Sequence, residues 1–217
     1  YRYQLGPSGI SLEELRAQPG GVQVPLETHY RKYAEQENGV ARGFRTPSRK
    51  IELYSETLLQ HGYPPLPEYE EPAVGPVTRP DLAERFPLIL TCTKNSLFCE
   101  TQHRALPGLR RQSMDPVVEL HPAAAAQRGI QQGDWVRVET PDGSVRARAR
   151  LNDTLQPDVA CGQHGWWQAS PEIGAPGYDP FSPEGANYNL LIGNQAIDPV
   201  SGSVPHRAYL CQIRLAE

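Results

Sequence analysis

The sequence predicts a mainly β chain: a closed or nearly closed barrel of short strands with short helices, preceded by an irregular α/β segment. Two observations lead to this prediction. Glycine (19) and proline (22) are abundant among the 217 residues, so the chain turns often and long helices do not dominate. From residue 86 onward, short apolar runs alternate with turn signals, a pattern typical of β-barrels.

The first segment, residues 1–63, is expected to contain only short elements. Ser11 and Glu14 form a capping box, which predicts a helix that begins directly after Ser11 and ends before the next proline. Apolar alternation over 50–54 predicts a strand, and Ser55 is expected to cap one further helical turn. Apolar residues are too few here for the segment to form a core alone.

Residues 64–85 are expected to be a linker, because prolines recur there and favour extended geometry without donors for a sheet. The barrel is expected over residues 86–217. Asp142-Gly143 predicts a hairpin turn, and Pro122 predicts the start of a short helix that is capped by Gly129. We expect strands over 86–91, 117–120, 134–139, 144–151, 159–161 and 208–215.

Charge and composition exclude several classes of protein. The net charge of −4 argues against a dedicated nucleic-acid-binding protein. No apolar run approaches about 18 residues, so no direct membrane insertion is expected. The four cysteines form no C-x-x-C pair, and no two of the six histidines have metal-ligand spacing. We therefore expect neither a disulfide scaffold nor a local metal site, and spacing alone indicates no catalytic residues.

Two loops of the barrel region are rich in polar side chains. The loop over 91–96 follows the first barrel strand and carries hydroxyl, amide and ammonium groups that suit an anion or a polar heterocycle. Residues 102–104 add further donors. The adjacent tryptophans of segment 163–167 either stack on the ring of a ligand or pack as a plug. The asparagine amides of 187–191 either bind the edge of a heterocycle or cap turns. Alternating arginines over 146–150 share one strand face, which we expect to be a solvated outer face, with a phosphate-binding ladder as the alternative.

Several segments of the sequence together resemble a known family. Residues 43–55 and 62–67 resemble the approach to the C-terminal domain in molybdopterin oxidoreductases of the dimethyl sulfoxide reductase family. The molybdopterin-dinucleotide-binding domain of that family is similar in further segments. These are residues 90–91, 115–122, 129–136, 187–191 and 198–203, whose order and spacing carry the resemblance.

The resemblance implies a six-stranded double-psi β-barrel and a ligand. That ligand is a molybdopterin guanine dinucleotide, one of two on a molybdenum or tungsten ion in the parent enzyme, with no covalent bond to this chain. Thr93-Lys94 stands where many members have Gly-Arg, and a lysine lacks bidentate geometry. By position, the resemblance assigns cofactor binding to Thr91, Thr93, Lys94, Asn95, Gln102, His103, Asn187, Asn189, His206 and Arg207.

The resemblance also implies how the chain is used. In the family, the protein ligand of the metal lies in an earlier domain, so we expect this chain to be the C-terminal part of a larger catalytic subunit and catalytically incomplete alone. Residues 1–63 would be the end of the preceding domain. Its partners would be the other domains of that subunit and, in some members, an iron–sulfur electron-transfer subunit.

The whole enzyme would move an oxygen atom or two electrons on a small substrate, in the cytoplasm or the periplasm. Two alternatives stay open at this stage. One is a stand-alone double-psi barrel that binds other proteins without a cofactor. The other is a small separate subunit that donates the barrel to a multi-chain enzyme.

Overall fold

The computed structural model describes residues 1–24 and 30–216. Contacts divide the chain into two compact units, Tyr1–Glu68 and Tyr69–Glu217. None of the helices in these described parts has the length and apolar character needed to cross a membrane. The second unit contains the barrel and both cavities that are considered below.

The first unit consists of short elements, and none of its described residues is buried. Ser11 caps α2, because its hydroxyl accepts the amide N–H of Glu14 at 3.0 Å, and Ser55 caps α3 in the same way. Both capping predictions are therefore confirmed. The elements are α1 (Arg2–Leu5), η1 (Gly6–Ser8), α2 (Leu12–Ala17), η2 (Lys32–Ala34), β1 (Gln36–Glu37), β2 (Val40–Ala41) and α3 (Glu56–Gln60).

The strand predicted over 50–54 is wrong, because this stretch is irregular. Ile51 and Leu53, which supplied the apolar alternation, are 71% and 83% exposed. A strand needs a neighbour that satisfies its backbone groups, and the described hairpin of this unit pairs β1 only with β2. Alternation alone therefore gave a false strand signal.

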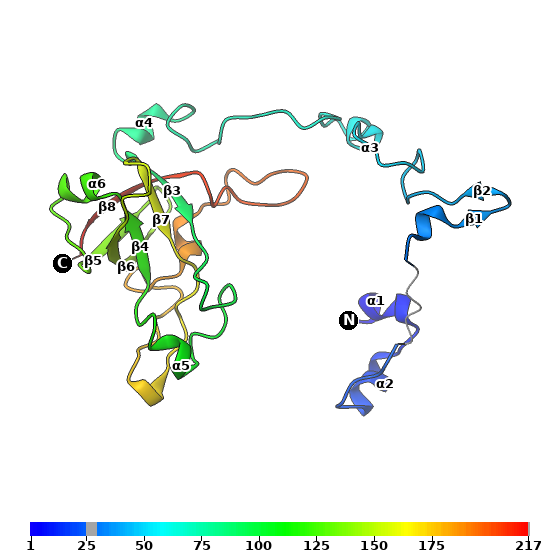
Figure 1. Ribbon diagram of the computed structural model, residues 1–217, viewed down its shortest axis with the longest axis horizontal. Helices are drawn as coiled ribbons and strands as arrows, with labels where there is room; N and C mark the ends of the chain where they lie inside the picture. The colour runs from blue at the N-terminus through cyan, green and yellow to red at the C-terminus, as the bar shows by residue number, and fades with distance from the viewer. Residues whose placement is uncertain (25–29, 217) are drawn as a thin grey trace. The chain divides into compact units, whose positions relative to one another are not determined.

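The second unit contains a closed six-stranded barrel, which confirms the predicted fold class (Figure 1). The order around the barrel is β3-β7-β4-β6-β5-β8, and each strand coincides closely with a predicted one. The Asp142-Gly143 turn joins β5 to β6 with Glu139 paired to Ser144, as predicted. The strands are β3 (Leu88–Cys92), β4 (Val117–Leu120), β5 (Trp135–Glu139), β6 (Ser144–Leu151), β7 (Val159–Gly162) and β8 (Tyr209–Leu215).

The barrel interior is filled by the inward side chains of its strands. Leu90, Leu120, Val136, Ala160 and Ile213 are fully buried. Fully burying one such aliphatic side chain larger than alanine stabilises the fold by about 1.5–3 kcal/mol before entropy is counted. On β6 the alanines point inward while the arginines point outward, so the predicted outer arginine face is confirmed.

Short helices cover the barrel. Residues 64–85 are not uniformly extended, since Val74 belongs to the barrel core and α4 begins at Pro80. Pro122 begins α6, as predicted. Residues 188–191 form a 3-10 turn that Asn187 caps and that buries Tyr188 and Leu191. The helices of this unit are α4 (Pro80–Ala83), α5 (Pro107–Arg110), α6 (Pro122–Ala126), η3 (Pro171–Ile173) and η4 (Tyr188–Leu191).

Candidate functional site

The register of two parallel strands brings two distant loops together. β3 and β7 pair in parallel with Cys92 opposite Gly162, so the chain leaves both strands at the same edge of the barrel. The amide of Thr93 continues the pairing by donating to the carbonyl of Gly162 at 2.8 Å. The loop that begins at Thr93 and the segment that begins at Gln163 are therefore neighbours, although 70 residues separate them.

One cavity at this edge, which we call the polar cavity, has a volume of about 390 Å³. Its walls combine two cations with hydroxyl and amide groups. Asn95 orders the loop, because its amide nitrogen donates to the Ser113 hydroxyl and its oxygen accepts the amide of Leu97. The longer polar side chains in its walls, together with Thr93, are those of Lys94, Asn95, Gln112, Arg150 and Gln163.

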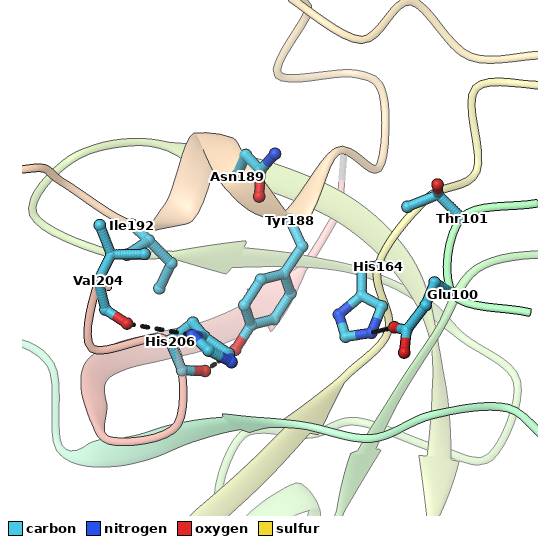
Figure 2. Close-up of a pocket in the computed structure, with 8 residues that line it drawn as sticks. All are labelled: Glu100, Thr101, His164, Tyr188, Asn189, Ile192, Val204 and His206. Carbon is cyan, nitrogen blue, oxygen red and sulfur yellow. Dashed lines mark hydrogen bonds and ion pairs between the residues drawn. The ribbon is translucent and has the colours of Figure 1, made fainter. Parts of the chain in front are cut away.

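A second cavity, which we call the histidine cavity, has a volume of about 520 Å³. Figure 2 shows Tyr188 between His164 and His206 in its wall. The Tyr188 ring meets His164 edge-on at 6.2 Å between centroids, and its hydroxyl donates to the carbonyl of His206 at 3.2 Å. Ile192 and Val204 contribute apolar surface, so this cavity joins aromatic and aliphatic walls to two imidazoles.

Glu100 connects the two cavities. Its carboxylate pairs with the Lys94 ammonium of the polar cavity and lies 3.3 Å from Nε2 of His164 in the histidine cavity. The hydrogen bond from Lys94 lowers the pKa of Glu100 below its usual value. Burial lowers the pKa of His164, and the nearby Glu100 carboxylate partly opposes that shift.

A buried arginine, which we call the Arg104 brace, holds the backbone of Glu100 and His164 in place. Arg104 donates to the carbonyl of Glu100 at 2.7 Å and to the carbonyl of His164 at 2.6 Å. Its guanidinium lies 4.9 Å from the ring of Trp166, and Arg110 lies 5.0 Å from the same ring. Trp166 is 1% exposed, so it packs as a plug rather than presenting its ring to a ligand.

The structure brings together only some of the residues that the sequence assigned to cofactor binding. Thr93, Lys94 and Asn95 lie in the polar cavity, and Asn189 and His206 lie in the histidine cavity.

The other five lie outside both cavities. Thr91 is a half-buried residue of β3, whereas Gln102, His103 and Arg207 are exposed. Asn187 is a capping residue: its oxygen accepts the amide of Asn189 and its nitrogen donates to the carbonyl of Pro180.

Other wall residues were not identified from the sequence. The arginine alternation over 146–150 is typical of a solvated strand face, so it does not single out Arg150 as a cavity residue. Glu100 is a lone acid in a loop whose other polar residues are mostly hydrogen-bond donors. Gln163 and His164 were noted only as neighbours of the tryptophan pair. Their positions follow from the strand register, which no local pattern in the sequence encodes.

The chemistry of the two cavities suits a large ligand with phosphate groups and heterocyclic rings. Lys94 and Arg150 supply positive charge, and hydroxyl and amide groups supply directed hydrogen bonds. The aromatic walls of the histidine cavity suit a planar ring. Among the described residues, Gln163 also has a buried side-chain oxygen without a hydrogen-bond partner.

Comparison with known proteins decides what this ligand is. A family model described as "Molydopterin dinucleotide binding domain" matches residues 88–209, which include all but the last residues of the barrel. The chain belongs to this molybdopterin-dinucleotide-binding family. The cofactor expected from the resemblance and the identity of the domain are thereby confirmed, and the alternative of a cofactor-free interaction module receives no support.

Relatives of this family cover most of the chain. The chain is 32% identical to acetylene hydratase of Syntrophotalea acetylenica over 96% of its length, and 37% identical to dopamine dehydroxylase of Eggerthella lenta over 79%. It superposes on the structure of acetylene hydratase from Pelobacter acetylenicus with a TM-score of 0.72 and 28% identity over 99% of the chain. The chain spans only 29%, 17% and 29% of these proteins, respectively.

Proposed function

We propose that the chain holds one molybdopterin guanine dinucleotide at the carboxyl ends of β3 and β7, as the C-terminal part of a molybdenum or tungsten enzyme. One observation carries the proposal: two cavities with complementary chemistry open at this edge, and Glu100 links their walls. The bound metal centre would supply the redox chemistry. The enzyme as a whole would transfer an oxygen atom or two electrons on a small substrate.

The residues of this chain would bind and orient the cofactor. Lys94 and Arg150 would neutralise phosphate charge, and Thr93 would give hydrogen bonds from the same wall. Asn95 would hold this loop in place through Ser113 and Leu97 and would offer the ligand the remaining N–H of its amide. Asn189, His206 and Tyr188 would border a ring in the histidine cavity. For Thr91, Gln102, His103, Asn187 and Arg207, a direct role in binding depends on rearrangement of loops or on contacts that only the bound cofactor makes.

We also propose that residues 1–63 are the end of the preceding domain and pack against the rest of the same catalytic subunit. Support comes from the apolar side chains that this unit leaves in solvent, such as Tyr3 at 95% and Leu53 at 83% exposure. An iron–sulfur electron-transfer subunit would be a second partner in an enzyme that takes electrons from a donor.

The experiment that tests the cofactor proposal measures metal and pterin in the full-length polypeptide that contains this chain. Native protein should contain near-stoichiometric molybdenum or tungsten together with about two pterins. Lys94→Ala should lower pterin retention, because it removes a cation from the polar cavity.

Arg214→Ala is the matched control. It removes an exposed cation of the barrel surface that pairs with Glu139 and lines neither cavity. Native protein without metal and pterin would refute the proposed function. Equal pterin retention by the two variants would refute the role of Lys94.

A further inference from the structure

The segment that follows β7 concentrates unpartnered polar atoms. Among the described residues, six buried side-chain nitrogen or oxygen atoms lack a hydrogen-bond partner, and four of them belong to residues 163–168. One of these four, Nε2 of His164, has the Glu100 carboxylate 3.3 Å away, so the atoms of Gln163, Trp166 and Gln168 remain. Buried polar atoms are normally paired, so such a concentration calls for a partner that the chain itself does not provide. The backbone is strained at the same place, with φ at +82° for Trp166.

Gln163 is the member of this group that lines the polar cavity, whereas His164 lines the histidine cavity beside Glu100. Gln163 is 6% exposed, and its Oε1 has no partner among the described residues. It separates the polar cavity from a small gap inside the barrel, beside Tyr188 and Gly162. That gap is only about 10 Å³, which is at the lower limit for one water molecule. Of these two spaces only the polar cavity is of ligand size, so a ligand that pairs with Oε1 would enter from that side.

We propose that Gln163 is a specificity-determining residue whose Oε1 accepts an N–H from the 2-amino group on the 2-amino-4-oxopyrimidine edge of the bound ligand. This edge presents adjacent N–H donors and is shared by guanine and by pterin. An acceptor that is buried without a partner rejects a ring that lacks the matching donor, because its desolvation then stays uncompensated. The inference rests on the proposed function, since it concerns the same polar cavity.

The side chain does not contribute to stability in the way that a structural glutamine does. Removing a buried polar atom that has no partner leaves the fold equally stable or more stable. Gln163→Leu should therefore keep the melting temperature of the full-length polypeptide while changing ligand preference. A structural role predicts the opposite result, in which stability falls and ligand preference is unchanged.

The experiment compares pairs of probes that differ at the 2-position. Full-length apo-polypeptide is titrated with GDP and with IDP, which lacks the 2-amino group, and separately with pterin-6-carboxylate and lumazine-6-carboxylate. The wild-type protein should prefer the amino-bearing member of at least one pair by about 5- to 100-fold. Preference within the first pair assigns the edge to guanine, and preference within the second pair assigns it to pterin.

Three variants complete the test. Gln163→Leu should abolish the preference, and Gln163→Glu, which keeps an acceptor oxygen, should preserve it. Gln112→Leu is the matched control, because Gln112 lines the same cavity but is exposed and already donates to the carbonyl of Gly108. No preference in either pair, or a preference that survives in Gln163→Leu, overturns the inference.

The outcome can be separated from that of the proposed function. Native polypeptide that contains pterin while Gln163→Leu behaves like the wild type refutes only the role of Gln163. Native polypeptide without pterin refutes the proposed function itself.

Discussion

Replacement of Gly165 by alanine tests whether the Arg104 brace positions the walls of the site. Gly165 has φ at +94°, and a Cβ at this position would lie 2.7 Å from Nη1 and 2.8 Å from Cζ of Arg104. The guanidinium cannot move away freely. It donates to the carbonyls of Glu100 and His164 and lies 4.5 Å from the ring centroid of Phe98.

The magnitude follows from two contributions. An unfavourable left-handed backbone costs about 1–2 kcal/mol for a residue with a Cβ. Displacement of Arg104 removes two hydrogen bonds from a charged donor, each worth about 1.5–3 kcal/mol. Because relaxation recovers part of this loss, we expect Gly165→Ala to lower the free energy of local opening by about 3–5 kcal/mol.

Hydrogen–deuterium exchange of the full-length polypeptide measures this opening directly. Exchange in peptides from 98–113 and 164–178 should accelerate by about two to four powers of ten. Gly174→Ala is the control, since Gly174 also has a positive φ of +64° but a Cβ there would meet nothing within 4 Å. It should accelerate exchange only about tenfold. Equal acceleration in both variants would refute the positioning role of Arg104.

Three further predictions concern the same region and the barrel core. Arg110→Lys should lower the free energy of local opening, measured by hydrogen–deuterium exchange, by about 2–4 kcal/mol, because the fully buried guanidinium donates to four backbone carbonyls. The same change at exposed Arg111 should have no effect. Burial lowers the pKa of His164, so the unfolded chain binds a proton at this imidazole more tightly than the folded chain does. The free energy of unfolding that this difference supports is fully present above about pH 6.5 and is lost as the pH falls below that value. In NMR titrations this imidazole should therefore titrate below 6.5, and lower still in Glu100→Gln. Burial also raises the pKa of Cys211, so iodoacetamide should label this thiol only after unfolding, and labelling of the folded protein would contradict its burial.

Much of the barrel could be predicted because its signals are local. The Asp142-Gly143 turn, Pro122 at a helix start and the inward alanines of β6 each fix a short stretch without help from distant residues. The false strand over 50–54 shows the limit of such signals. Its alternation was present, but the partner strand was not, and sheet formation depends on that partner.

The site was less predictable because it depends on register between distant segments. The loop after β3 was identified from its composition, and Lys94 indeed lies in a cavity. Gln163 and Arg150 reach the same cavity through the pairings β3–β7 and β4–β6, which local sequence does not determine. Asn187 is an error of the opposite kind, because it was assigned to cofactor binding and instead caps a turn. Asparagine suits both roles, and here the amide oxygen and the amide nitrogen of the side chain both bond to backbone groups.

Arg104 and Arg110 show why composition alone does not reveal what an arginine near the candidate site does. Among the described residues, neither guanidinium forms an ion pair with a carboxylate. Both donate to backbone carbonyls, although Nε of Arg104 is left without a hydrogen-bond partner. Burial lowers the pKa of Arg104 to about 10, yet this value still leaves the group charged at neutral pH. Two buried positive charges therefore lie beneath the wall that Glu100 and His164 form. If the proposed cofactor binds there, their field would favour its phosphate groups while their hydrogen bonds hold the backbone.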